Sequence, residues 1–410
     1  MASLIDMSNL ISRPIAEPRT SPLAVSSSWP MYEPDEIAAV TEVLRSGRVN
    51  ALVHGEQNKA FEREFASFIG MPHAIAVANG TVSLEIAFRA LGIGTGDEVI
   101  IPARSFFATA SAVVAVGAEP VFADVEIHSQ NIDPASVLRM ISERTKAIVC
   151  VHLAGRPCDL ESLNEICMSN GLLLIEDCAQ AHGARYKGRA VGSFGAASSF
   201  SFCTDKIMST GGEGGMVLFK SEAVWANAWA IKDHGKQPPE HRPQGTGLPG
   251  EFRYIHQSFG SNFRMTEMQA AIGRAQLRKL PQWIDRRRSN AETLAAEISG
   301  LPGLLPDQPD PHGQHAWYKF YALIDETGLP AGLTRSDIIG EMTRVGIQCG
   351  SGSCPDMSKE AAFDGRPVRR DGNLPNANSL GARTIMFPVD HLLNEMDMRK
   401  ISDALKGILQ

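Results

Sequence analysis

The sequence lacks any stretch typical of a secretory signal or a membrane span. Its first 30 residues show no cationic segment followed by an apolar one. The longest weakly polar run, Ser105–Ala118, has only 14 residues and suits a buried helix better than a membrane span. We therefore expect a cytoplasmic protein that does not enter membranes.

Paired cysteines and an excess of positive charge are absent as well. The seven cysteines form no Cys-x-x-Cys pair and no zinc-like spacing with histidine, so we expect reduced thiols and no metal site. A net charge of −7 argues against binding to nucleic acid or to an anionic membrane. With 43% hydrophobic and 21% charged residues, the 410-residue chain has the composition of a globular protein of two or three domains.

What the sequence does contain is an alternation of helical patterns and short apolar runs from about residue 36 onward. The stretch HAIAVANGTVSLEIAFRALGIGTGDEVIIPARS predicts a strand, a turn, a helix and a second strand. AIVCVHLAG, GLLLIEDC, SSFSFC and GGMVLF predict further strands, all without polar alternation. Such runs indicate an α/β fold in which a mostly parallel sheet lies between helices.

Three parts are expected along the chain: an N-terminal arm over residues 1–35, a large domain over 36–280 and a smaller C-terminal α/β domain over 281–410. The boundary falls on a long helical pattern that is interrupted at Pro281. Residues 234–262, before this helix, are polar and rich in proline and glycine. This stretch is too long for a plain connector, so we expect it to reach a site or a partner subunit.

Three features that could carry chemistry stand at strand ends, where open α/β sheets bind ligands. Gly80 and Thr81 begin a helix whose free N–H groups suit a phosphate, although the same residues can simply cap a helix. Glu176 and Asp177 end an apolar strand; a structural salt bridge is the alternative, and the pattern does not show which acid points inward. Lys206 lies between SFSF and STGGEGG, whose glycines leave room for a ligand; the alternative is a solvated loop lysine.

Together these features are more specific than any one of them. A partly desolvated lysine loses its proton readily and can form a Schiff base with a carbonyl. A lysine, an acid at a strand end 29 residues before it and a phosphate-binding helix start are what pyridoxal phosphate requires. A P-loop would not need the acid, and a hydride-transfer site would not need the lysine.

Four segments, in this order, resemble the landmarks of the DegT/StrS sugar aminotransferases, which are fold-type I enzymes dependent on pyridoxal phosphate. They are ANGTVSLEIAFRALGIGTGDEVIIPARSFFATASAVVAVGAEPVFADVE, IEDCAQAHGARYKGRAVGSFGAASSFSFCTDKIMSTGGEGGMVLF, GSNFRMTEMQAAIGRAQL and LPNANSLGARTIMFP. The similarity runs from about Trp29 to near the C-terminus, so it covers almost the whole chain.

The resemblance implies a role for each matching residue. Lys206 would bond to the cofactor and then carry the proton, and Asp177, rather than Glu176, would pair with the pyridine nitrogen. Gln180 would contact the phenolic oxygen of the cofactor, and Phe106 would stack on its ring. The residues that match the phosphate cup are Gly80, Thr81 and Ser201.

Asn262, in GSNFRM, matches a residue that reaches the cofactor phosphate of the other subunit, which implies a homodimer with shared active sites. The dehydratase branch of the family carries a histidine where Lys206 stands, so the lysine implies transamination. His182 could contact substrate or be a hydrogen-bonded core histidine, and Glu213 could serve only to fix its turn. GGEGG is one glycine longer than the expected GEGG, so the lysine loop could take a different path.

We therefore expect an aminotransferase that moves an amino group, from L-glutamate by resemblance, to a keto group of a nucleotide-linked deoxy sugar for surface polysaccharide. CVHLAGRPCDLESL and IEDCAQAHG look most like perosamine synthases, which aminate carbon 4, but carbon-3 and keto-cyclitol aminotransferases share the same cofactor residues. Arg264, Lys319 and Arg185 are candidates for a substrate diphosphate or for plain surface charge.

Two alternatives belong to other classes of protein. A regulator of this fold would keep the cofactor residues but bind a partner through an added domain, and the sequence shows no DNA-binding extension or basic patch. A cysteine-dependent sulfur transferase would need an exposed cysteine on a mobile loop, for which Cys354 is the candidate.

Overall fold

The computed structural model describes residues 23–52, 54–238, 241, 256–307, 310 and 312–409. Residues 1–22 of the predicted N-terminal arm lie outside these ranges, and so does most of the polar insertion around residues 238–250. None of the helices in the described part combines the length and the apolar character that crossing a membrane requires.

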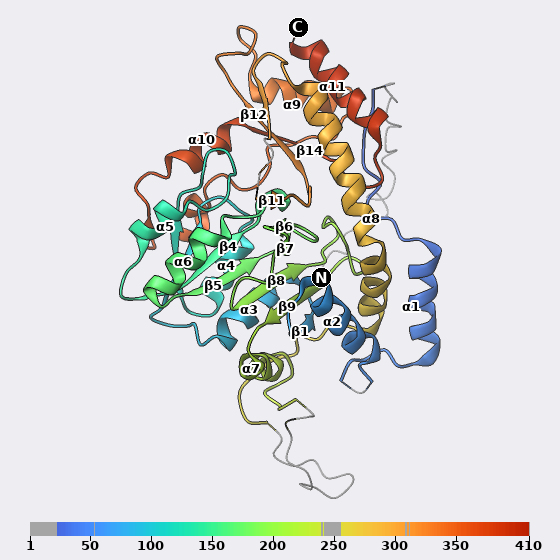
Figure 1. Ribbon diagram of the computed structural model, residues 1–410, viewed down its shortest axis with the longest axis vertical. Coiled ribbons are helices and arrows are strands. Elements are labelled where there is room, and N and C mark those ends of the chain that lie inside the picture. The colour runs from blue at the N-terminus through green and yellow to red at the C-terminus, as the bar shows by residue number, and fades with distance from the viewer. Residues whose placement is uncertain are drawn as a thin grey trace, which may run out of the picture.

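The centre of the protein is a sheet of eight strands (Figure 1). From one edge to the other the strands are β1 (His73–Val77), β9 (Gly215–Phe219), β8 (Ala197–Ser201), β5 (Leu173–Asp177), β4 (Thr145–Val151), β2 (Glu98–Pro102), β3 (Glu119–Ala123) and β13 (Arg369–Arg370). Strand β9 is antiparallel to both of its neighbours, and the strands from β8 to β13 run parallel. The prediction of a mostly parallel sheet is confirmed.

Both faces of this sheet are covered by apolar side chains, because successive residues of a strand point to opposite faces. In β2, Ile100 belongs to the apolar cluster on one face, whereas Val99 and Ile101 belong to the cluster on the other. The helices that contribute to the first cluster include α2 (Glu56–Ile69), α5 (Pro134–Met140) and α6 (Leu160–Asn170). Those that contribute to the second include α3 (Gly80–Ala90), α4 (Ala108–Ala115) and α10 (Pro375–Arg383). Helix α7 (Glu222–Lys232) packs at the edge formed by β1 and β9.

Helix α8 (Glu267–Ile298) connects the large sheet with the C-terminal part of the chain (Figure 1). It packs against α1 (Pro34–Ser46) and α2, and also against α11 (Glu395–Leu409). The predicted interruption at Pro281 is wrong, because one helix of 32 residues passes through it. Leu280 and Ile284, on either side of the proline, are buried in the same apolar cluster, and this packing compensates for the lost backbone hydrogen bond.

The C-terminal part has a core of its own. Strands β10 (Leu304–Pro306), β12 (Phe320–Ile324) and β14 (Thr384–Phe387) form an antiparallel sheet. Helices α9 (Arg335–Arg344) and α11 and the second half of α8 bury a third apolar cluster against it. A further small sheet consists of β11 (Gly313–Gln314), β6 (Arg185–Tyr186) and β7 (Arg189–Ala190). The predicted smaller α/β domain is therefore present, while its boundary at residue 281 stays a prediction.

Candidate active site

A cavity of about 800 Å³ opens at the carboxyl ends of the parallel strands. Its walls include residues at or just after the ends of β1, β2, β4, β5 and β8, where ligands of open α/β sheets bind. The C-terminal part closes another side with Tyr318, Lys319 and Tyr321. Of the eight site residues predicted from sequence, seven line this cavity: Gly80, Thr81, Phe106, Asp177, Gln180, Ser201 and Lys206.

The start of α3 forms one end of the cavity. The Asn79 side chain caps the helix by accepting the N–H of Val82 at 2.9 Å, and the first turn leaves the N–H groups of Gly80 and Thr81 without helical acceptors. A Cβ added at Gly80 would lie 2.6 Å from Cβ of Ser201, so only glycine allows this serine so close to the helix start. The arrangement combines free N–H groups, a hydroxyl and the positive end of a helix dipole, which suits a phosphate.

Asp177 brings a carboxylate to the floor of the cavity. Its Oδ2 accepts a hydrogen bond from Thr109 Oγ1 at 2.9 Å, and its Oδ1 accepts one from the N–H of Ala179 at 3.1 Å. Burial raises the pKa of Asp177, although the N–H of Ala179, the Thr109 hydroxyl and the charge of Lys206 oppose the increase. A buried acid with few donors of its own favours a cationic partner inside the cavity.

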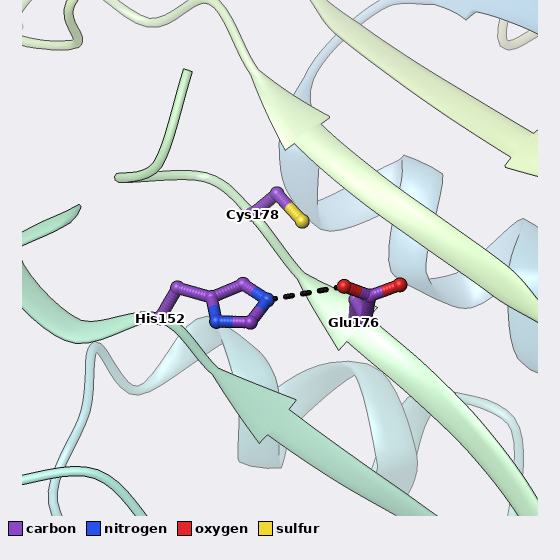
Figure 2. A group of neighbouring side chains, drawn as sticks. All are labelled: His152, Glu176 and Cys178. Carbon is purple, nitrogen blue, oxygen red and sulfur yellow. Dashed lines mark hydrogen bonds and ion pairs between the residues drawn. The ribbon is translucent and has the colours of Figure 1, made fainter. Parts of the chain in front are cut away.

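Glu176, one residue earlier on β5, points to the opposite face of the sheet and does not line the cavity. Its Oε1 accepts the N–H groups of Phe194 and Gly195, both at 2.7 Å, and its Oε2 accepts that of Gly192 at 2.7 Å. His152 Nε2 lies 3.3 Å from the same Oε2 (Figure 2). The sequence pattern leaves open which of the two acids points into the cavity. In the structure it is Asp177.

The surroundings of Glu176 define a structural cluster that also includes Cys178 (Figure 2). Nδ1 of His152 accepts the N–H of Cys158 at 3.0 Å, so the ring proton is on Nε2 and is donated to Glu176. Burial alone would raise the pKa of Glu176, but the His152 bond and the N–H groups of Gly195 and Gly192 outweigh it and hold the pKa below its ordinary value. The bonds of Glu176 to the N–H groups of Gly192, Phe194 and Gly195 tie the loop after β7 to the end of β5, and we assign the cluster to holding this loop in place.

Lys206 follows β8 and lines the cavity. Its side chain is 13% exposed, and Nζ lies 3.8 Å from Oδ1 of Asp205 and 5.0 Å from the ring centre of Tyr318. The backbone carbonyl of Lys206 accepts the indole N–H of Trp29 at 2.8 Å, which fixes the lysine loop to the chain before α1. The glycines after the lysine are required by the path of the loop, since Gly211 and Gly212 have φ values of +84° and +115°.

Two further cavity residues are suited to a flat polar ring. Gln180 accepts the N–H of Ala154 through Oε1 at 2.7 Å, which directs its amide NH₂ group as a donor. Phe106 is 66% exposed although its ring is apolar. An aromatic side chain held open at a cavity provides a stacking face for an aromatic ligand.

Asn262 is the predicted site residue that does not line this cavity. It is exposed and forms a backbone bridge with Asp233, so its expected contact with a partner subunit stays a prediction. Glu213 lines the cavity, and its backbone carbonyl accepts the Thr210 hydroxyl and the Gln269 amide, each at 2.7 Å.

The sequence offers a catalytic role for His182 and for Cys354, and the structure argues against both. His182 is fully buried between Phe200 and Phe202 and does not line the cavity, and burial, reinforced by Lys206, lowers its pKa to about 3. Cys354 lies outside the cavity lining with Sγ 3.0 Å from Glu360, and burial together with that carboxylate raises its pKa to about 12. A thiol held protonated is a poor nucleophile for sulfur transfer.

Of the three basic candidates for a substrate diphosphate, Lys319 lines the cavity. Burial lowers the pKa of Lys319, and the nearby charge of Arg287 adds to this effect. Arg185 is exposed and donates to the carbonyl of Gly188 at 3.0 Å, whereas Arg264 pairs with Asp233 at 2.7 Å and lines a different cavity.

The sequence interpretation missed Thr109, Asp205 and Tyr318. The Tyr318 hydroxyl donates to Asp205, and burial of this aspartate is outweighed by Lys206 and Tyr318, which hold its pKa below the ordinary value. Asp205 adjoins Lys206 in the chain and could have been found from that position alone. Tyr318 comes from the C-terminal part, and only the packing of that part against the sheet brings it to the lysine.

Comparison with known proteins defines the class of this site. The profile of the DegT/DnrJ/EryC1/StrS aminotransferase family matches residues 30–406. The chain belongs to this family and is a pyridoxal-phosphate-dependent aminotransferase.

Individual relatives carry several different names. The chain is 38% identical over 401 residues to an L-glutamine:2-deoxy-scyllo-inosose aminotransferase of Micromonospora echinospora, covering 93% of both chains. It is 40% identical over 277 residues to a GDP-perosamine synthase of Vibrio cholerae, covering 67% of this chain and 71% of the relative. An aminotransferase structure from Psychrobacter cryohalolentis superimposes with a TM-score of 0.89 at 42% identity, over 93% of this chain and 98% of the other.

The residues of the cavity fit the cofactor of this family. A related Escherichia coli structure, a GDP-4-keto-6-deoxy-D-mannose-3-dehydratase, holds hydrated pyridoxal phosphate; it is 27% identical with a TM-score of 0.81 over 95% of this chain and 99% of that one. In this chain Ser201 lies so close to Gly80 that a Cβ at this position would disturb the helix start, whose N–H groups suit the phosphate of the cofactor. A second close contact supports it, since a Cβ at Gly215 would lie 2.4 Å from the carbonyl oxygen of Asn79.

We predict that Glu176→Gln destabilises the fold by about 2 kcal/mol at neutral pH, because a buried acceptor of backbone N–H groups loses its charge. The lowered pKa in the folded state means that the carboxylate contributes stability above its unfolded pKa, near about 4.3, and that this contribution is lost as the pH falls through the folded value. Urea unfolding at neutral and acid pH measures both effects. Glu143→Gln, at an exposed position, is the control, and equal unfolding midpoints for the two variants would contradict the assignment.

We predict that Gly80→Ala weakens retention of pyridoxal phosphate about tenfold, because the added methyl group displaces Ser201 or the helix start. Cofactor remaining after dialysis, measured by absorbance, tests this. Gly407→Ala on α11 is the matched control, since no atom lies within 4 Å of its added Cβ. Unchanged retention in Gly80→Ala would show that the phosphate binds elsewhere.

Proposed function

We propose that this aminotransferase moves an amino group from L-glutamate to the keto group at carbon 4 of a nucleotide-linked deoxy sugar. The product would be an amino sugar for a polysaccharide or a natural product. The observation that carries the proposal is that Lys206, Asp177 and the N–H groups of Gly80 and Thr81 face one cavity. Within the family, similarity to a GDP-perosamine synthase supports a sugar substrate.

Each residue of the cavity has a separate task in this proposal. Pyridoxal phosphate, when bound, supplies an electron sink for the carbon that loses its proton. Asp177 would pair with the pyridine nitrogen and keep it protonated, and Thr109 and Ala179 orient its two oxygens. Gln180 and Phe106 would orient the ring, and the start of α3 would bind the phosphate.

Lys206 Nζ is the atom to which we assign proton transfer. When it is not covalently bonded, this amine would take the proton from the α-carbon of the amino-acid donor and deliver it to the cofactor. In the second half of the reaction it would carry a proton in the reverse direction, to the carbon of the acceptor that receives the amino group. Positioned general acid–base catalysis of this kind contributes about 10²–10⁴-fold in rate. Asp205, at 3.8 Å and held by Tyr318, limits the positions that Nζ can take.

The exposed position of Asn262 supports a proposal for the subunit arrangement. This side chain lies outside the cavity of its own chain and on the polar stretch around residues 256–262. We infer that it binds the cofactor phosphate of a second copy, which makes the active unit a homodimer. The seven free cysteines are compatible with the reducing cytoplasm that we expect for the enzyme.

A keto-cyclitol is the second candidate acceptor. The specific observation in its favour is the extent of the match to the scyllo-inosose aminotransferase, which covers 93% of both chains. The name of that relative also makes L-glutamine the alternative donor.

A substrate panel decides between these acceptors. Purified holoenzyme is incubated with L-glutamate or L-glutamine and with either GDP-4-keto-6-deoxy-D-mannose or 2-deoxy-scyllo-inosose, and amine products are identified by mass spectrometry. The proposal predicts an aminated nucleotide sugar formed with L-glutamate. Product from the cyclitol alone would replace the proposed acceptor, and no product from any pair would exclude both.

We predict that Asp177→Asn lowers kcat about a hundredfold or more while part of the cofactor is retained, because the amide cannot stabilise a protonated pyridine ring. Asp364→Asn, at an exposed position, is the control and is expected to leave kcat unchanged. Steady-state kinetics with the best donor measure the difference. A near-normal rate in Asp177→Asn would mean that another acid serves the ring.

A further inference from the structure

A second cavity, of about 630 Å³, lies away from the proposed active site. It is lined mainly by α2, the start of β1 and the end of α7, and shares no lining residue with the first cavity. Strand β1 begins in this second cavity at His73 and ends at Val77, just before Asn79 in the first. The two cavities therefore lie near opposite ends of β1.

The lining of the second cavity is strongly cationic on a chain whose net charge is −7. Two carboxylates, Glu62 and Asp233, face five cationic side chains: Lys59, Arg63, Lys232, Lys236 and Arg264. Asp233 is already shared by Arg264 at 2.7 Å and Lys236 at 3.6 Å. Glu62 accepts the N–H of Ala76 at 2.9 Å. The lining has a surplus of positive charge that no acid in it balances.

Lys232 is a largely buried lysine that contributes to this surplus of positive charge. Its residue exposure is only 7%, yet it lines the cavity, and Nζ lies 4.7 Å from the ring centre of Trp229. Within the described ranges its Nζ makes no hydrogen bond and no ion pair within 4.0 Å. Burial lowers the pKa of Lys232, and the more distant charges of Glu62 and Asp233 oppose that effect. An ammonium group without a partner, on a largely buried side chain that lines a cavity, favours an anion in that cavity as its partner.

The dimensions and the aromatic walls of the cavity suit a small molecule. A volume of about 630 Å³ is within the usual range for small-molecule sites. Trp225 lies in the wall with His73 stacked against it at a ring-centre distance of 5.5 Å. A single carboxylate would leave most of the surplus charge unbalanced, whereas a diphosphate carries a charge of matching size, and lysine is a common phosphate ligand.

We propose that this second cavity binds the diphosphate group of a small molecule, with Lys232 at its base and Lys59 and Arg63 at its rim. The proposal concerns binding and does not depend on the aminotransfer reaction. The shared chemistry is the diphosphate, which free pyrophosphate and a nucleoside diphosphate both present.

The test is calorimetric titration of the holoenzyme with inorganic pyrophosphate at constant ionic strength. We expect a binding event that Lys232→Met weakens about tenfold, because one charge-assisted contact is lost. Lys146→Met, at an exposed lysine outside the cavity, is the matched control and should bind as the wild type does. Equal affinity in Lys232→Met and wild type would overturn the proposal. So would the absence of pyrophosphate binding, the result expected if a second copy of the chain fills the cavity.

Further variants and a second ligand distinguish the possible reasons for a negative result. Arg63→Gln, at the exposed rim, should also weaken binding, with Arg45→Gln as its control, so the test survives if Lys232→Met does not fold. Lys206→Ala should bind pyrophosphate with unchanged affinity, which separates failure of this site from failure of the proposed enzyme function. The titration is then repeated with GDP to identify the natural source of the diphosphate. If GDP binds more tightly than pyrophosphate and this binding depends on Lys232, the site is assigned to a nucleotide. If the two ligands bind with equal affinity, the site is assigned to free pyrophosphate.

Discussion

The two adjacent carboxylates at the end of β5 are the constraint on which the site depends. Neighbouring residues of a strand point to opposite faces, so Glu176 and Asp177 cannot share one environment. The charge of Glu176 is stabilised by three backbone N–H groups and by His152, and these bonds fix the loop after β7 and the end of β4. In the described part of the chain Asp177 accepts only two hydrogen bonds, and its carboxylate faces the cavity. The more completely bonded acid thus holds the framework, and the less completely bonded one is available for chemistry.

The second requirement is that the C-terminal part closes over the strand ends. Helix α8 provides this connection because it continues through Pro281, with its first half buried in the apolar cluster of the large sheet and its second half in that of the small sheet. The closure brings Tyr318 to Asp205 and places its ring near Lys206. The position of the lysine is therefore set jointly by both parts of the chain, and not by its glycine-rich loop alone.

Much of this arrangement could be predicted from sequence, since apolar runs without polar alternation identify buried strands and the strand ends identify the ligand edge. The orientation of Glu176 and Asp177 could not be derived from the pattern, because both faces of β5 are buried; only the family resemblance favoured Asp177. The expectation that a proline interrupts a helix considers only the local sequence. It therefore could not predict that tertiary packing lets α8 continue through Pro281. Tyr318 was missed for a related reason, as its role comes from a contact between residues more than a hundred positions apart.

Family membership establishes an aminotransferase and its cofactor, and the cavity supplies a physical reason for each proposed residue. The central claim is that Lys206 is the amine that bonds to pyridoxal phosphate. The most direct measurement is the absorbance spectrum of purified wild type and of Lys206→Ala, both supplied with the cofactor, before and after addition of L-glutamate. The account predicts that only the wild type shows the absorbance band of lysine-bound cofactor and that glutamate removes this band. The same band in Lys206→Ala would contradict the account, because another amine would then hold the cofactor.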